Sequence, residues 1–170
     1  MKISNFKYRI TVTTLLAVLV GLPIFVQAGS DDEALKVIIE ETRNGWINAD
    51  GAPFRKNFLD YEGARYIEGG GQNEGLTDLI SHHVVPEADA FKSFELNYSN
   101  IETHVEGDFA WAIADTEIKA VVKRNDRVID NKGYQTYIFR KIDGLWKIIH
   151  THSSSRPVKK AKPSEHKAAQ

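Results

Sequence analysis

Four of the six histidines offer the clearest candidate chemistry in this sequence. His82 and His83 are adjacent, and one residue separates His150 from His152. Alternate side chains of a β-strand point to the same face, so His150 and His152 would lie side by side on one strand. Two imidazoles at this spacing can bind a divalent metal ion. In the alternative interpretation these histidines are hydrogen-bonded members of a pocket or core, with no metal.

A metal site here would suit zinc or copper, which both accept imidazole ligands. His83 could supply a third ligand beside His150 and His152, and the carboxylate of Glu68 or Glu87 could complete the shell. The chain has no cysteine, which excludes disulfides, thiolate metal sites and a cysteine nucleophile. If the histidines serve a pocket instead, no cofactor is expected.

Acid–base chemistry is the second possibility. Removing a proton next to a carbonyl group requires a positioned base and a hydrogen-bond donor for the developing oxyanion. Asp115 or His150 could be the base, and Tyr137 or Tyr66 could be the donor. In the structural interpretation the strand aspartate is solvated and the tyrosines belong to the core.

The elements that would position these residues divide into helices first and strands afterwards. Ser30 or Asp31 can cap a helix whose apolar residues recur at helical spacing as far as Trp46. Residues 54–59 form a short second helix, and residues 64–67 are extended. A third helix starts near residue 77, carries His83 on its inward face and ends before Pro86. This order predicts an α+β domain.

Four β-rich segments follow, at residues 94–105, 109–122, 128–142 and 145–153. Turn-forming residues separate them, and Asp143-Gly144 is the strongest hairpin signal. Consecutive hairpins of this kind predict an antiparallel meander.

The last hairpin allows a register to be predicted. If Asp143-Gly144 is a two-residue turn, Ile142 pairs with Leu145, His150 opposes Tyr137 and His152 opposes Gln135. Those four side chains would share the interior face. The facing of Asp115 and Trp111 is left open, because a bulge near residues 131–133 would reverse their parity.

The opposite face of the same hairpin has few charges. By the predicted register it carries two isoleucines and two threonines, Ile138, Ile149, Thr136 and Thr151. A sheet face of this composition is suited to pairing with a second copy of the chain. We therefore expect a homodimer formed through the sheet.

The first 28 residues read as a signal peptide. Lys2, Lys7 and Arg9 precede an uncharged apolar stretch that ends in the small-residue pattern Val26-Gln27-Ala28. Cleavage after Ala28 predicts a periplasmic or secreted protein without stable membrane anchoring. The remaining chain has 19 basic and 23 acidic residues.

The basic residues gather in the last segment, residues 156–170, which also contains two prolines. Its composition is typical of a disordered, solubilising tail, and no nucleic-acid binding is expected. The domain organisation is thus a signal peptide at 1–28, one globular domain at 29–155 and a basic tail at 156–170.

Several segments, in this order, resemble the SnoaL-like branch of the nuclear transport factor 2-like superfamily, which also contains ketosteroid isomerases and polyketide cyclases. They are FLD at residues 58–60, the glycine at 75, GDFAW at residues 107–111 and the closing GLWKIIHTHS at residues 144–153. The resemblance implies a cone-shaped fold in which three N-terminal helices pack on a curved antiparallel sheet. It also implies a small-molecule pocket at the open end and dimerisation through the sheet.

The predicted function is therefore that of an exported domain that binds a small molecule in the cone pocket. The alternatives are a divalent metal-binding protein that uses His150, His152 and His83, and an isomerase or cyclase that acts by proton abstraction. The residues expected to contact a ligand are Tyr137, His150, His152, Gln135, His83, Tyr66 and Asp115.

Overall fold

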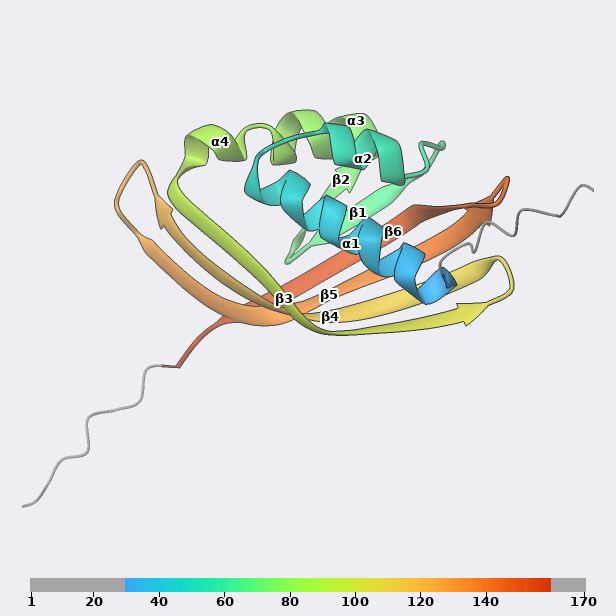
Figure 1. Ribbon diagram of the computed structural model, residues 1–170. Coiled ribbons are helices and arrows are strands. Elements are labelled where there is room, and N and C mark those ends of the chain that lie inside the picture. Colours follow the sequence, from blue (N-terminus) through green and yellow to red (C-terminus); the bar gives the residue numbers. More distant parts are fainter. Residues whose placement is uncertain (1–29, 160–170) are drawn as a thin grey trace, which may run out of the picture.

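The computed structural model describes residues 30–159. The predicted signal peptide and residues 160–170 of the predicted tail lie outside the described residues. Helices precede strands along the chain, and the helices lie together on the concave side of a curved sheet (Figure 1). The predicted α+β class with N-terminal helices on a curved sheet is confirmed.

The first helix, α1 (Asp31–Ile47), begins as its sequence predicts. Ser30 is the N-cap, and its side-chain oxygen accepts a hydrogen bond from the backbone N–H of Glu33 at 3.3 Å. The acidic residues of the first turn face the positive end of the helix dipole. The second helix, α2 (Ala52–Asn57), is short and has Pro53 in its first turn.

The third helical segment is longer than predicted. It starts as α3 (Leu76–Asp78), continues as a π-helix, η1 (Leu79–Val84), and resumes after Pro86 as α4 (Glu87–Ala90). Pro86 is the N-cap of α4, with φ −65° and ψ −16°, so it opens a new helical turn. This arrangement places Glu87 near His83, four residues earlier.

Six strands form one sheet in the order β2-β1-β6-β5-β4-β3. Their bounds are β1 (Arg65–Glu68), β2 (Gly71–Glu74), β3 (Phe91–Glu106), β4 (Phe109–Val122), β5 (Val128–Ile142) and β6 (Leu145–Pro157). The four long strands form the predicted antiparallel meander, but β1 pairs with β6 in parallel. The sheet is therefore mixed, and the prediction of a purely antiparallel sheet is wrong at this one pair. The short strand β2, which starts at Gly71, was not predicted.

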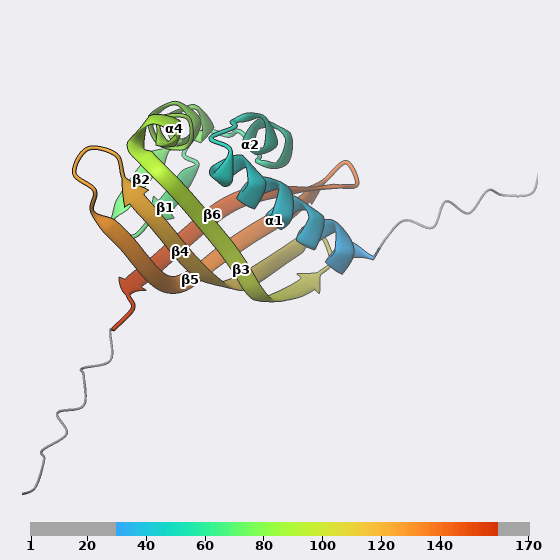
Figure 2. The same cartoon turned by 60° about the vertical axis from the view of Figure 1, so that its left-hand side comes forward.

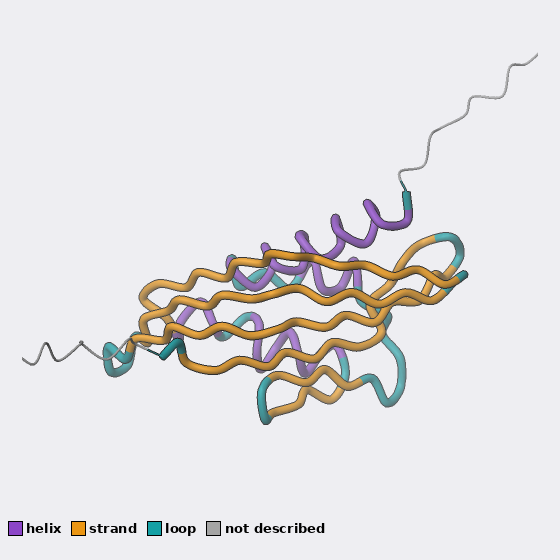
Figure 3. Tube along the Cα trace, turned by 90° about the horizontal axis from the view of Figure 1, so that it is seen from below, coloured by secondary structure: helices purple, strands orange, loops and turns teal. Residues whose placement is uncertain are grey.

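The core lies between the helices and the concave sheet face (Figure 2). Its largest fully buried side chains include Tyr66, Tyr137, Phe54, Phe139, Leu35 and Ile39. On the outer face the long strands lie in front of the helices, and no helix of the described part of the chain covers them (Figure 3). No helix within residues 30–159 is long and apolar enough to cross a membrane.

The predicted register of the last hairpin is correct near the turn and wrong beyond it. Ile142 pairs with Leu145 and Phe139 pairs with Ile148, as expected, but the next pair is Ile138 with His150. A β-bulge at Ile149 adds one residue to β6 and reverses the parity of everything after it.

This bulge changes which side chains face the interior. Tyr137 now pairs with Thr151, which is buried, whereas His152 pairs with Thr136 and is exposed. Thr151 is therefore not on the predicted dimer face, and His150 and His152 do not face the predicted pocket. The β4–β5 ladder runs without a shift through residues 131–133, so the bulge considered there is absent.

Candidate functional site

A cavity of about 240 Å³, here called the central cavity, opens between the helices and the concave sheet face. One wall is largely aromatic and aliphatic and comes from α1, β3, β4 and β5. The other lining residues carry titratable, hydroxyl and amide groups. The lining residues are Trp46, Glu68, His83, Glu87, Phe91, Phe94, Leu96, Tyr98, Thr116, Ile118, Ile129, Asn131, Gln135, Ser153, Ser154 and Ser155.

His83 enters the central cavity from η1. Its Nε2 atom lies 2.6 Å from Oε2 of Glu68 on β1. The hydrogen bond to Glu68 raises the pKa of His83, and partial burial opposes this effect. The Trp46 ring packs edge-on against the imidazole, with 5.4 Å between ring centroids. The imidazole is therefore fixed between an acidic partner and an aromatic wall.

Glu87 is the second titratable group of the central cavity. Its Oε1 atom lies 3.9 Å from Nε2 of His83, and its Oε2 atom is buried without a hydrogen-bond partner among residues 30–159. Burial raises the pKa of Glu87 to about 7; the charge of His83 lowers it and the charge of Glu68 raises it. A carboxyl group with this pKa can hold or release a proton near neutral pH.

The aromatic wall is preorganised by its own contacts. The rings of Phe91 and Phe94 stack, with centroids 5.3 Å apart. The hydroxyl of Tyr137 donates a hydrogen bond to the hydroxyl of Tyr98 at 3.1 Å. Burial raises the pKa of Tyr98 to about 12, so this phenol is neutral at physiological pH. Tyr98 lines the central cavity, and Tyr137 lies behind it in the core.

The structure brings together only some of the predicted site residues. His83 and Gln135 line the central cavity, as predicted. Tyr137 and Tyr66 are buried in the core, where the Tyr66 hydroxyl donates to the carbonyl of Leu59 at 3.4 Å. These two tyrosines support the fold around the cavity.

Three other predicted residues lie away from the central cavity. Asp115 is on the outer sheet face and accepts a hydrogen bond from the Asn100 side chain at 2.8 Å. Nδ1 of His150 lies 2.7 Å from the carbonyl oxygen of Arg65, and His152 is exposed. The bulge at Ile149 is the reason that the two strand histidines do not face the interior.

The predicted metal ligands His150, His152 and His83 are not brought together. Within the described residues, no group of three or more His, Cys, Asp or Glu side chains is placed to hold a metal ion. The geometry of residues 30–159 thus gives the metal-binding alternative no support.

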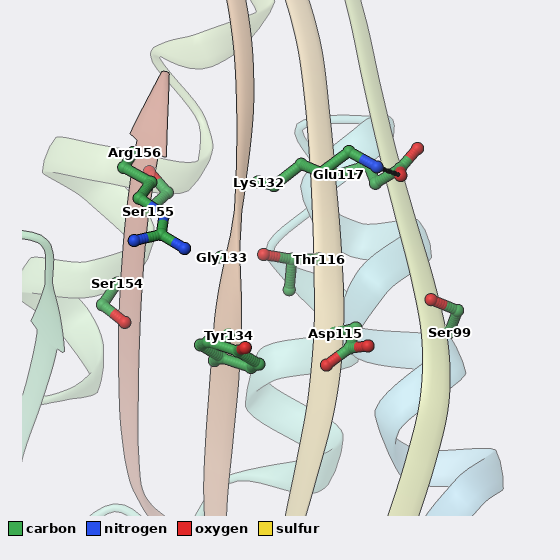
Figure 4. A pocket seen from close by; sticks show the side chains of 10 residues that line it. All are labelled: Ser99, Asp115, Thr116, Glu117, Lys132, Gly133, Tyr134, Ser154, Ser155 and Arg156. Carbon is green, nitrogen blue, oxygen red and sulfur yellow. Dashed lines mark ion pairs between the residues drawn. The ribbon is translucent and has the colours of Figure 1, made fainter. Parts of the chain in front are cut away.

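A larger hollow of about 510 Å³, here called the outer hollow, lies on the uncovered sheet face (Figure 4). Asp115 and Tyr134 come from neighbouring strands and lie near each other there. Lys132 and Glu117 form an ion pair across its rim. These charged groups are already paired and solvated, so we place the candidate site in the smaller central cavity, where a carboxyl group is buried.

Several residues of the central cavity were not predicted from the sequence as ligand contacts. The helical spacing of Trp46 indicates a core position, and Glu87 is predicted only as a residue that could complete a metal shell. The available signal was the spacing of four residues between His83 and Glu87, which places side chains together if the helix continues. Pro86 predicts the end of the helix, whereas in the structure it is the N-cap of α4.

Comparison with known proteins agrees with the fold described above. The model of the SnoaL-like domain family matches residues 39–159. No curated protein matches the chain. Among solved structures, a nuclear transport factor 2-like superfamily protein from Salmonella enterica serovar Typhimurium has a TM-score of 0.67 and 20% identity, covering 79% of this chain and 96% of that one.

Two further structures carry enzyme names. A candidate ketosteroid isomerase from Shewanella frigidimarina has a TM-score of 0.62 and 22% identity, covering 72% of this chain and 96% of the other. A candidate dehydratase of the same superfamily from Streptomyces avermitilis has a TM-score of 0.61 and 15% identity, with 75% and 96% covered. At these identities the structures show a shared fold. Since the family model matches most of its length, the chain belongs to the SnoaL-like domain family, with a nuclear transport factor 2-like fold.

Proposed function

We propose that this protein binds a small, partly apolar organic molecule in the central cavity. The observation that carries the proposal is a 240 Å³ cavity lined by aromatic side chains together with His83 and Glu87. Small-molecule sites typically combine an apolar lining with a few convergent polar groups that fix the ligand's orientation. The central cavity has both parts.

The apolar and the polar lining residues would contact different parts of the ligand. Phe91, Phe94 and Trp46 remove the apolar part of the ligand from water. Gln135 and Ser153 offer neutral hydrogen-bonding groups at the sheet side of the same space. The volume of the central cavity limits the ligand to about the size of one ring with a short substituent.

Benzyl alcohol is a suitable neutral probe, and its binding can be followed by ligand-observed NMR. Ile129 lines the central cavity, so Ile129→Trp should fill it and abolish binding. Val128, the preceding residue of β5, is 71% exposed, so Val128→Trp adds the same side chain without entering the cavity. Binding that survives in Ile129→Trp, or that is absent from the unaltered protein, would contradict the proposal.

Proton-transfer catalysis is a second candidate function. The observation in its favour is the pKa of about 7 of Glu87, whose carboxyl oxygen is 3.9 Å from Nε2 of His83. A general base works best when its pKa is close to the working pH, and the imidazolium N–H could donate to a developing oxyanion. The names of the two enzyme-like structures above are consistent with this chemistry.

Deuterium incorporation next to the carbonyl of cyclohexanone, measured by NMR in heavy water, tests the catalytic candidate. The unaltered protein should accelerate exchange above the buffer rate, and Glu87→Gln should remove the acceleration. Exchange at the buffer rate would leave the protein as a binder only.

A further inference from the structure

We infer that the central cavity selects organic cations, specifically small amines with one positive charge, held by the Glu87 carboxylate against the aromatic wall. This inference rests on the proposed binding function of the same cavity and names its ligand class. It follows from three observations: the charge balance of the lining, the unpartnered oxygen of Glu87 and the aromatic side chains beside it.

The lining of the central cavity contains more acidic than basic side chains. Of the described residues that line the cavity, two are glutamates, one is histidine, and none is lysine or arginine. Glu68 is matched by His83 at 2.6 Å. The ionised Glu87 is then left without a balancing charge inside the cavity. Burying an unbalanced charge is costly, and a monovalent cation would remove that cost.

The groups around Glu87 do not supply this cation themselves. Those facing it are Glu68 from β1, His83 from η1, Tyr98 from β3 and the uncharged Trp46 from α1. Lys92 lines an adjoining groove that Glu87 also lines, but its ammonium group forms an ion pair with Asp126. Arg43 on α1 is bound to Glu40 and to the carbonyl oxygen of Leu96.

The Glu87 carboxylate is also incomplete in its hydrogen bonds. Its Oε2 atom is buried and has no partner within residues 30–159, whereas buried polar atoms in folded proteins nearly always have one. Its Oε1 atom is 3.9 Å from His83, beyond hydrogen-bond distance. An ammonium group carries N–H donors and a positive charge, so it would satisfy both deficits together.

The aromatic lining suits the same ligand class. Trp46, Phe91, Phe94 and Tyr98 all line the cavity that contains Glu87. A cation placed over such ring faces is attracted by their negative electrostatic potential. Carboxylate or phosphate ligands would instead meet two glutamates and no lysine or arginine in the lining.

Three probes with one ring and different charges test this inference: benzylamine, benzyl alcohol and benzoate. In calorimetry at about pH 8, benzylamine should bind about tenfold more tightly than benzyl alcohol, the size of one well-placed charge interaction. Benzoate should show no saturable binding. At about pH 5.5, where Glu87 holds its proton, the preference for benzylamine should disappear while the affinity for benzyl alcohol is unchanged.

Glu87→Gln keeps the side-chain shape and removes the charge. In this variant benzylamine should bind no more tightly than benzyl alcohol, and saturable binding of benzyl alcohol shows that the cavity is still formed. Asp89→Asn is the matched control, because Asp89 lies in the same helix with its side chain 96% exposed. The control should keep the full preference for the amine.

The outcomes separate the inference from the proposal on which it rests. If none of the three probes binds, the binding function itself fails. If benzyl alcohol or benzoate binds as tightly as benzylamine at about pH 8, the cavity binds small molecules but the cation inference is overturned. A preference that persists in Glu87→Gln overturns it as well.

Discussion

Nε2 of His83 lies 2.6 Å from Oε2 of Glu68, and this contact joins the π-helical segment to the short strand β1, which lies between β2 and β6. The bond to Glu68 raises the pKa of His83 in the folded protein. The raised pKa means that the pair stabilises the fold fully below the histidine's unfolded pKa, and that this stabilisation is lost as the pH rises through the folded pKa.

Glu87 should add to this pH dependence. The folded pKa of about 7 exceeds the ordinary value of 4.5, so the folded state binds a proton that the unfolded state releases first. The free energy of unfolding should therefore fall as the pH rises from about 4.5 to 7, and stay low above that range. Between pH 5 and pH 8 the unaltered protein should lose about 2–3 kcal/mol of unfolding free energy that Glu87→Gln keeps.

Urea denaturation at several pH values measures this difference. Asp89→Asn serves again as the control, and its stability should run parallel to that of the unaltered protein. A Glu87→Gln curve that also runs parallel would show that the carboxyl group is not buried as described.

We expect no tight metal binding, in contrast to the metal-binding alternative that the sequence offers. Because His150 and His152 lie away from His83, zinc added to the protein should show no saturable site of sub-micromolar affinity in calorimetry. His150→Ala and His152→Ala should leave the zinc titration unchanged. A tight site that either substitution abolishes would restore the metal-binding alternative.

The part of the fold that could be predicted is the part set by local signals. Ser30 with the acidic first turn located the start of α1, and Asp143-Gly144 fixed the first pairs of the last hairpin. The bulge at Ile149 could not be predicted, because either register offers an apolar residue to the core there. It is accompanied by non-local contacts: before it Phe58 bridges to Ile148, and after it Tyr66 pairs with Thr151.

The candidate site could likewise be predicted only where local sequence signals determine it. Helical spacing placed His83 inward, which the structure confirms. The position of Glu87 depends on the helical turn after Pro86, and a proline can either end a helix or start one. The pairing of His83 with Glu68 depends on where β1 joins the sheet, which no local pattern encodes.

Self-association through the outer sheet face remains a prediction, with a corrected set of residues. Trp111 and Phe109 are 36% and 44% exposed on this face, and Trp111 pairs with Ile138. Light scattering at micromolar concentration should give the mass of a dimer, and Trp111→Glu should give a monomer, because a buried charge would oppose association. Val37→Glu, at an exposed position of α1, should remain dimeric. A monomeric unaltered protein would contradict this prediction.

Export is also a prediction, since residues 1–28 lie outside the described part of the chain. Expressed with its own N-terminus in a Gram-negative host, the protein should be recovered from the periplasmic fraction with Gly29 as its first residue. N-terminal sequencing of the fractionated protein checks this. An intact Met1 in the membrane fraction would be incompatible with cleavage.

Gly133 should be the least replaceable glycine of the sheet. It pairs with Ser155, and a Cβ atom at this position would collide with the carbonyl oxygen of Ser154 and lie 2.7 Å from Cα of Ser155. Backbone atoms cannot move aside as a flexible side chain can, so β5 and β6 would have to separate. We expect Gly133→Ala to lower the free energy of unfolding by about 1–3 kcal/mol in urea denaturation.

Gly133→Ala should also alter the central cavity, because Ser154 and Ser155 line that cavity. Gly133→Ala should therefore weaken benzyl alcohol binding at a temperature where the variant is still folded. Gly70→Ala is the matched control: Gly70 lies in the turn between β1 and β2, where an added Cβ meets nothing within 4 Å. That substitution should change stability by less than about 0.5 kcal/mol. Equal stability of the two variants would mean that β6 does not approach Gly133 as closely as described.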